Sequence, residues 1–467
     1  MSFKGQINFG YPLTFHNIVT TIPDNAVLPL SIGSSLQGNV LGVTFGDLKS
    51  QVSSPSVIAV NGTTLYSTIP LAGPLVGPLS DIGNIAFGDK AGQNTQTANA
   101  TFLGIESGAF ATNASNSIFI GYYSGRNATN ANASTFLGNG AGNNATNASY
   151  SNFIGLNAGS GATDAHHSNF LGYLAGALAT NANNSNFLGQ FAGYQASSES
   201  STFIGEQAGN NANGCSYSNF MGIQAGLNAS SSYFTNFIGY SAGQLAVSSQ
   251  RSTFIGFGAG IQVNNCSYSN FIGPNAGRNA LNSEHSTFIG EESGYTAQLN
   301  YSNCMGNESG WMSNNSAYVN FIGQQAGRNS TGATASNFIG FQAGRNSTGG
   351  ERANFIGEQA GFNSTGALNT NFIGSGAGLG STNTNQSNFI GRFAGYNSTG
   401  SNVNAFGYQA HAGGSLSGQT VFANVSLPSY GNRAAATTAI TVLNGASAGS
   451  TYLYYNQTTF AIEAVRL

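Results

Sequence analysis

Few residues in this 467-residue chain could bind a metal or act as a nucleophile. Of its five histidines, only His166 and His167 lie beside a carboxylate, that of Asp164. Nitrogen and oxygen ligands of this kind can hold zinc. However, this cluster falls in one polar turn segment, which favours a solvated turn. The sequence therefore predicts a non-enzymatic protein with no metal site, no cofactor and no catalytic residue.

The three cysteines are Cys215, Cys266 and Cys304. Cys215 and Cys266 occupy the same phase of an internal repeat, three repeats apart, so stacked strands would place them about 14 Å from each other. That distance excludes a disulfide within the chain. Cys304 takes a position that usually holds phenylalanine, which predicts a small buried apolar side chain. The odd count leaves a disulfide between chains open for the other two.

Many Asn-x-Ser/Thr sequons occur, and the candidate glycosylation sites include Asn127, Asn144, Asn329 and Asn346. One interpretation is a rod coated with sugars. The alternative is that turns built from Asn, Ala, Ser and Thr generate sequons by composition. The second is favoured because the amino terminus lacks a basic region before an apolar run, which predicts no secretory signal peptide.

One short phrase, Asn-Phe-Ile-Gly followed two residues later by Ala-Gly, organises most of the chain. Its first glycine recurs 20 times between Gly88 and Gly407. The step is about 17 residues and sometimes one fewer, and a fixed period of this kind indicates a solenoid of stacked coils. The short steps recur every 101 residues, ending at Gly104, Gly205, Gly306 and Gly407. Duplication of a six-coil block explains this best, and a periodic reset of sheet twist is the alternative.

Neighbouring side chains in a β-strand point to opposite faces. The two apolar residues of each phrase must therefore face opposite ways, one into the coil and one out of it. Leaving nearly 20 such side chains in water would forgo roughly 1.5 to 3 kcal/mol each. We therefore predict an oligomer of this chain, with core and interface positions that include Phe153, Ile154, Phe338, Ile339, Phe355 and Ile356.

The rest of each coil predicts its shape. Ala-Gly suits a tightly packed strand or corner, and the Asn- and Thr-rich returns suit turns whose side chains bond to the next coil. Each coil supplies only one large apolar pair, which favours a flattened β-roll closed by association over a three-sided β-helix. Ala86 and Ala405 replace phenylalanine in the two end coils, as in atypical terminal repeats.

The chain divides into three predicted parts. Residues 1–83 form a β-rich docking region and neck, with a hairpin at Asn61-Gly62. Residues 84–413 form the solenoid. Residues 414–467 form a β-rich cap whose candidate surface contacts are Tyr452, Tyr454 and Tyr455.

Composition excludes two classes of partner. Charged residues make up 6% of the chain and the net charge is −3, so there is no basic field for nucleic acid and no polybasic patch for a membrane surface. The apolar stretch at 57–79 is interrupted by prolines and polar residues, which excludes a membrane-spanning helix there.

The phrases at 338–344 (Phe-Ile-Gly-Phe-Gln-Ala-Gly) and 355–361 (Phe-Ile-Gly-Glu-Gln-Ala-Gly) carry a resemblance. They resemble the repeats of phage tail-fibre and other virus-associated proteins, and the β-roll is similar to the heads of trimeric autotransporter adhesins. The resemblance covers the repeats at 84–413, which are most of the chain. It implies a homotrimeric β-roll.

Together the pattern and the resemblance predict a structural fibre or spike shaft on a virion surface or in an extracellular setting. Such a shaft would dock to a virion or surface protein and attach to a host receptor, for example a glycan. A prokaryotic surface adhesin or extracellular filament subunit is the alternative, and an ice-binding β-solenoid is a third.

Overall fold

The structure is a computed structural model that describes residues 84–411, 413–415 and 417–422 with their side chains, and seven further strands by their backbone. The chain forms two compact units, Met1–Pro74 and Leu75–Leu467. In the first, β1 (Val27–Leu30) pairs antiparallel with β2 (Leu41–Thr44), and β3 (Ile58–Val60) with β4 (Thr63–Leu65). The second of these pairs flanks Asn61-Gly62, as the predicted hairpin requires.

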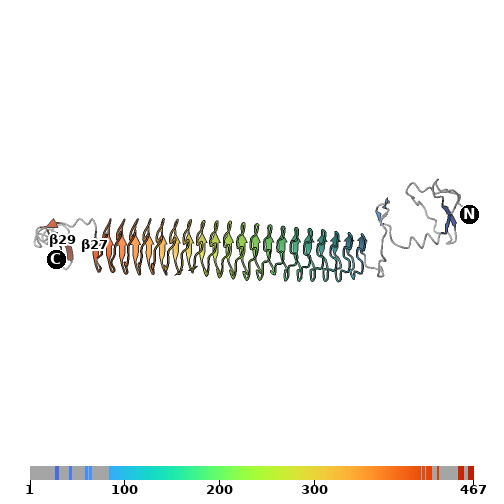
Figure 1. Cartoon of the computed structure of the whole chain (residues 1–467), viewed down its shortest axis with the longest axis horizontal. Helices are drawn as coiled ribbons and strands as arrows, with labels where there is room; N and C mark the ends of the chain where they lie inside the picture. The colour runs from blue at the N-terminus through green and yellow to red at the C-terminus, as the bar shows by residue number, and fades with distance from the viewer. Residues whose placement is uncertain are drawn as a thin grey trace. The chain divides into compact units, whose positions relative to one another are not determined.

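The second unit contains the solenoid. Twenty-one parallel strands form one continuous sheet in which each strand pairs with the same strand of the next coil (Figure 1). Among the described residues, β5 pairs only with β6 and β27 only with β26, so the sheet is open at both ends. The predicted parallel β-solenoid of about 20 coils with a 17-residue period is confirmed. Its last strand, β27, lies within the segment that the sequence analysis assigns to the cap.

The strands of this sheet are short and regularly spaced. They are β5 (Ile85–Phe87), β6 (Thr101–Leu103), β7 (Ile118–Ile120), β8 (Thr135–Leu137), β9 (Asn152–Ile154), β10 (Asn169–Leu171), β11 (Asn186–Leu188), β12 (Thr202–Ile204), β13 (Asn219–Met221), β14 (Asn236–Ile238), β15 (Thr253–Ile255), β16 (Asn270–Ile272), β17 (Thr287–Ile289), β19 (Asn303–Met305), β21 (Asn320–Ile322), β22 (Asn337–Ile339), β23 (Asn354–Ile356), β24 (Asn371–Ile373), β25 (Asn388–Ile390), β26 (Asn404–Phe406) and β27 (Thr420–Phe422). The second unit has two further sheets: β18 (Leu299–Asn300) with β20 (Ser316–Ala317), and β28 (Ser429–Tyr430) with β29 (Thr451–Asn456) and β30 (Ala461–Arg466).

Coil positions are numbered here from the first strand residue, so that the coil at 152–168 runs from position 1 to position 17. Positions 1 to 3 form the strand. A second line of contact runs through position 12, where single residues bridge in parallel from coil to coil, as in Thr112 to Thr129 and Thr129 to Thr146. The coil between these two lines consists of tight turns, and the described residues contain no helix.

The coil interior is filled by its own side chains. Phe153 at position 2 and Ala158, Ala162 and Ala165 at positions 7, 11 and 14 are all completely buried. Stacked phenylalanine rings continue from coil to coil, with a centroid distance of 4.7 Å between Phe153 and Phe170. Small alanine and glycine residues let the opposite backbone approach the ring. The expectation that the roll is closed by association is therefore wrong, because each coil closes on itself.

Buried serines at position 17 tie the coils together. The hydroxyl of Ser151 donates to the carbonyl of Ala165 at 2.6 Å and accepts from the backbone N–H of Ser168 at 3.0 Å. Both partners belong to the next coil. This arrangement satisfies polar groups that would otherwise cost about 1 to 3 kcal/mol each when buried.

The sequence allows either a tightly packed strand or a corner at Ala-Gly, and the structure has a corner there. Gly159 has φ +62°, and a Cβ built on it would lie 2.3 Å from Cδ2 of Phe153. The first glycine of the phrase has a different reason: a Cβ on Gly155 would lie 2.4 Å from the carbonyl oxygen of Gly172 in the next coil. Only glycine allows this approach of ring and backbone.

The shorter coils lack one turn residue. Thr180 bridges Ser197 at the full period, whereas Phe187 pairs with Phe203, a step that is shorter by one residue. The missing residue therefore belongs to position 13, which in the longer coils is a turn residue with positive φ, such as Asn181. The strand and its register are unaffected. Near the ends of the stack, Ala86 in β5 and Ala405 in β26 occupy the interior position opposite phenylalanine, as the sequence predicts, and Val421 follows Ala405 in the last strand.

Candidate interaction surface

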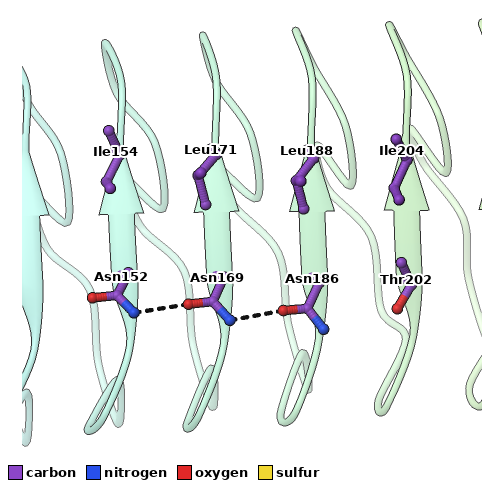
Figure 2. A pocket seen from close by; sticks show the side chains of 8 residues that line it. All are labelled: Asn152, Ile154, Asn169, Leu171, Asn186, Leu188, Thr202 and Ile204. Atoms are coloured by element: carbon purple, nitrogen blue, oxygen red, sulfur yellow. Dashed lines mark hydrogen bonds between the residues drawn. The ribbon is translucent and has the colours of Figure 1, made fainter.

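The outward face of the strands runs along the whole solenoid, from β5 to β27. It consists of the side chains at positions 1 and 3, which point away from the phenylalanine stack. Figure 2 shows four consecutive coils of this outward strand face, with asparagine or threonine in one row and isoleucine or leucine in the other. A shallow open groove runs between the two rows. The row at position 3 is apolar in every coil from β5 to β27.

The apolar row is only partly covered by its own neighbours. Ile356 and Ile373 are 38% and 37% exposed, and Met221 and Met305 are each 41% exposed. Stacked neighbours therefore cover more than half of each side chain. Covering the remainder would gain about 0.6 to 1.2 kcal/mol per side chain, less than the value for a fully exposed residue. Taken over the whole row, the exposed apolar area is still larger than the apolar patch that monomeric proteins usually expose.

The polar row is a hydrogen-bonded ladder. In each rung the side-chain Nδ2 of one asparagine donates to Oδ1 of the next. Six consecutive bonds of 2.7 to 2.9 Å join Asn303, Asn320, Asn337, Asn354, Asn371, Asn388 and Asn404. Threonine interrupts the ladder nearer the amino terminus, for example at Thr202 (Figure 2). The ladder fixes these amides in one orientation, so the face presents a regular polar edge beside the apolar row.

The predicted core and interface residues separate cleanly. Phe153, Phe338 and Phe355 are fully buried in the coil interior. Ile154, Ile339 and Ile356 lie on the outward strand face. The phenylalanine in each pair thus belongs to the core, and the isoleucine is the residue that a partner could contact.

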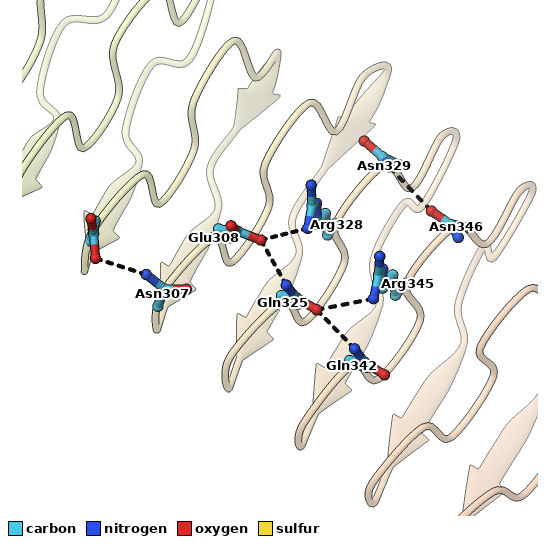
Figure 3. Close-up of polar contacts among 9 residues, drawn as sticks. Asn307, Glu308, Gln325, Arg328, Asn329, Gln342, Arg345 and Asn346 are labelled. Atoms are coloured by element: carbon cyan, nitrogen blue, oxygen red, sulfur yellow. Dashed lines mark hydrogen bonds and ion pairs between the residues drawn. The ribbon is translucent and has the colours of Figure 1, made fainter.

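A second ladder follows position 6 on another side of the coil (Figure 3). Gln342 donates to Gln325, and Gln325 donates to Glu308, both at 2.8 Å. Arginines at position 9 join the ladder: Arg328 pairs with Glu308 at 2.6 Å and Arg345 donates to Gln325 at 3.1 Å. The carboxylate of Glu308 is thereby neutralised within the coil stack, so this network serves cohesion between coils.

Position 16 carries an exposed row of aromatic and cationic side chains. Over seven consecutive coils it holds Tyr217, Phe234, Arg251, Tyr268, His285, Tyr301 and Tyr318. The rings stack face to face, with centroid distances of 4.7 Å between Tyr268 and His285 and 5.1 Å between Tyr301 and Tyr318. Arg251 replaces a ring, lying 6.0 Å from the Phe234 centroid and 5.2 Å from that of Tyr268. We call these side chains the position-16 row.

The cluster of Asp164, His166 and His167 belongs to such rows. Asp164 accepts a hydrogen bond of 2.6 Å from Asn147, and His167 stacks on Tyr150 at 5.1 Å. The side chains of Asp164 and His167 thus contact residues of the neighbouring coil. Within the described ranges, no three His, Cys, Asp or Glu side chains come together in a way that could hold a metal ion.

All three cysteines are buried and free. Cys215 and Cys266 occupy position 14, where most coils have alanine. Burial raises the pKa of the Cys215 thiol to about 11 and that of Cys266 to about 12. Burial also raises the pKa of Cys304. Complete burial keeps Cys215 and Cys266 from a disulfide between chains, the possibility that the sequence left open.

The sequon asparagines lie at position 10, at the corner of the coil. Asn127 donates to Asn144 at 2.9 Å, and Asn329 donates to Asn346 at 3.2 Å (Figure 3). A sugar on the Nδ2 of Asn127 or Asn329 would leave that nitrogen one N–H in place of two. Tyr452, Tyr454 and Tyr455 belong to β29, whose backbone pairs with β28 and β30, and their side chains lie outside the described residues.

Reasoning from the sequence missed two features, the Gln325 ladder and the position-16 row. Both follow from aligning the coils and reading each position as a column, since stacking brings equivalent residues of successive coils into contact. A column that collects tyrosine, histidine and arginine in consecutive coils is the signal that was available.

Comparisons with protein-family models, curated proteins and solved structures give no match for this chain. In the part of the chain that the structure describes, no helix has the length and apolar character needed to cross a membrane.

Proposed function

We propose that this chain is the structural, non-enzymatic shaft of a fibre or spike on a virus particle, and that it acts in attachment to a host surface. The observation that carries the proposal is the uninterrupted stack of coils from β5 to β27, with one sheet along its whole length and a column of buried phenylalanines from Phe102 to Phe389 that only Cys304 interrupts. At about 4.8 Å per coil, the stack spans roughly 95 Å. Many of its polar side chains form hydrogen bonds with the neighbouring coil, which suits a rigid spacer.

The first experiment locates the protein. Antibodies against the solenoid, bound to intact virus particles and viewed by negative-stain electron microscopy, should label thin projections on the particle surface. Label on a cell surface or on free filaments, with none on particles, would contradict the virion proposal and support the surface adhesin or filament subunit instead.

The outward strand face is the proposed self-association surface, and a homotrimer is the proposed state. A second copy of the chain supplies the same spacing of about 4.8 Å, so its apolar row matches this one along the full length. It would also bring a second asparagine ladder beside the first. A partner of any other fold would match these rows over only a few coils.

Native mass spectrometry of the full chain tests this state. We expect a trimer for the wild-type chain and monomers when Ile356→Asp and Ile373→Asp place charges on the outward strand face. The matched control carries Thr348→Asp and Thr365→Asp at position 12, on the other line of contact between coils, and should remain a trimer. A wild-type monomer, or equal loss of the trimer in both variants, would refute the proposed interface.

Ice binding is the weaker alternative. Position 12 holds threonine in five consecutive coils, from Thr331 to Thr399, a regular hydroxyl row. The column includes serine, asparagine, valine and leucine in the central coils, which breaks that regularity. A thermal-hysteresis assay of the purified chain would detect such an activity, and none is expected.

A further inference from the structure

We propose that the column at position 16 contains three open rungs, at Ala133, Ser200 and Ala335, and that each binds one pyranose ring of a glycan. The inference deepens the proposed attachment function, on which its biological meaning rests. It concerns three specific places on the rod surface, each formed by three consecutive coils.

Each opening is large enough for one ring. Tyr318, Ala335 and Arg352 occupy position 16 in successive coils, and all three side chains are exposed. Tyr318 and Arg352 are two coils apart, so about 9.6 Å separates their levels on the rod. Stacked rings elsewhere in this column are 4.7 to 5.1 Å apart. One more ring therefore fits above Ala335 at the spacing that the column already uses.

The exposure of the tyrosines supports the opening. Tyr318 is 60% exposed, whereas Tyr301 and Tyr268, which have a planar neighbour on each face, are 48% and 45% exposed. Tyr150 is also 60% exposed, and it lies beside the other alanine of the column, Ala133. Each of these two tyrosines stacks on one face only, on Tyr301 and His167 respectively. Tyr217, beside Ser200, also stacks on one face only, on Phe234, and is 50% exposed. The second ring face of each of these tyrosines is open to a ligand.

The longer, six-coil repeat supplies an internal comparison. Ala133 and Ala335 lie two of its periods apart, and the equivalent residue in the middle block is Phe234. The backbone is the same at all three places, with φ of 52°, 59° and 53° at Ala133, Phe234 and Ala335. Phe234 stacks on Tyr217 at 4.9 Å and fills its rung. The backbone at this position thus accommodates a ring, and the first and third blocks have alanine there in place of one.

The chemistry of the walls indicates the ligand. Each opening has a tyrosine at position 16 on one side and a planar hydrogen-bonding side chain at position 16 on the other, which is Arg352, Asn116 or Asn184. Phe234 lies between Tyr217 and Arg251, so a ring fits between one tyrosine and one guanidinium. A pyranose has an apolar C–H face for the tyrosine ring and hydroxyl groups for arginine or asparagine. Thr334 and Glu351 at position 15 add polar groups beside Ala335.

Saturation-transfer difference NMR on the full chain tests the inference. The probes are the methyl pyranosides of glucose, galactose and mannose, with N-acetyl-tyrosinamide as the aromatic comparison. We expect at least one pyranoside to receive saturation on its C–H face. Filling one rung, by Ala133→Phe or Ala335→Phe, should lower the signal by about a third. The triple variant, with Ala133→Phe, Ser200→Phe and Ala335→Phe, should lower it more than tenfold.

The control variant carries Ala133→Ser and Ala335→Ser, which leave these rungs open and should keep the wild-type signal. Serine is tolerated at this position, as Ser200 shows. Circular dichroism confirms that each variant is folded. The inference is refuted if none of the three pyranosides binds, if the triple phenylalanine variant binds them as well as the wild type, or if only the tyrosinamide binds. These outcomes do not depend on where the protein is located, so they are separate from the labelling of virus particles.

Discussion

Leu299 and Cys304 together fill the space that a phenylalanine ring fills in the neighbouring coils. Both side chains are completely buried. A Cβ built on Gly310 would lie 2.5 Å from Sγ of Cys304 and 3.1 Å from Cδ1 of Leu299, whereas the same atom on Gly294 meets the ring of Phe288. The smaller residue at position 2 is thus compensated by a larger one at position 14, where most coils have alanine.

Substituting either Leu299 or Cys304 alone should destabilise the solenoid. Leu299→Ala should cost about 2 to 5 kcal/mol because it opens a cavity. Cys304→Phe should cost about 1 to 3 kcal/mol because the ring meets Leu299. The double variant restores the usual arrangement and should unfold close to the wild type in urea, followed by circular dichroism. Simple addition of the two single effects would show that the side chains do not share one space.

Two glycines separate the effect of packing from that of backbone conformation. Gly344 and Gly332 have φ of 63° and 67°, but a Cβ on Gly344 would lie 2.2 Å from the Phe338 ring, whereas on Gly332 the nearest atom is 3.7 Å away. Gly332→Ala should cost only the left-handed conformation, about 1 to 2 kcal/mol. Gly344→Ala should lower the melting temperature much further. Equal losses would mean that the ring moves freely and that the core is less tightly packed than these distances indicate.

The buried thiols predict a stability that falls in alkaline solution. Burial raises the pKa of Cys215 to about 11 and that of Cys266 to about 12 from the model-compound value of 9.0, so folding favours the neutral thiol. The stability is then fully present below about pH 9 and declines as the pH rises towards 11 and 12, at about 1.4 kcal/mol per pH unit for each group. Urea unfolding between pH 8 and 10.5 measures the slope.

The matched control for this slope is the chain with Cys215→Ala and Cys266→Ala. Alanine is the usual residue at position 14, so the variant should fold, and its stability should vary less with pH. Tyrosine ionisation affects both chains equally and cancels in the comparison. If the two slopes are the same, the thiols of Cys215 and Cys266 do not carry the pH dependence.

The short coils lack a turn residue and keep their strands. Inserting asparagine between Gln298 and Leu299 should therefore add the missing turn and leave the pairing of Phe288 with Cys304 unchanged. A crystal structure of the variant would show this directly. A changed angle between β17 and β19 would instead support the hypothesis that each deletion resets the twist of the sheet.

The sequence predicted the solenoid well because its period and strand alternation are local properties. Phe153 and Ile154 point to opposite faces for the same reason in every coil. The sequence did not predict that alanine and glycine close the coil. Closure depends on how closely the opposite backbone approaches the phenylalanine ring, and the packing of the whole stack sets that distance. The position-16 row was missed because its contacts join residues of different coils and become visible only when the coils are aligned.

The direction of the hydrogen bonds has a mechanical consequence. Bonds such as that from Gly155 to Leu137 run along the rod axis and join each coil only to its neighbours. Tension applied to the two ends therefore loads all the coils in series, so the weakest coil, or an end coil, yields first. Each coil that peels off releases up to about 60 Å of extended chain in place of about 5 Å of rod. Under a strong pull the stiff shaft would thus lengthen in steps, as an extensible tether does.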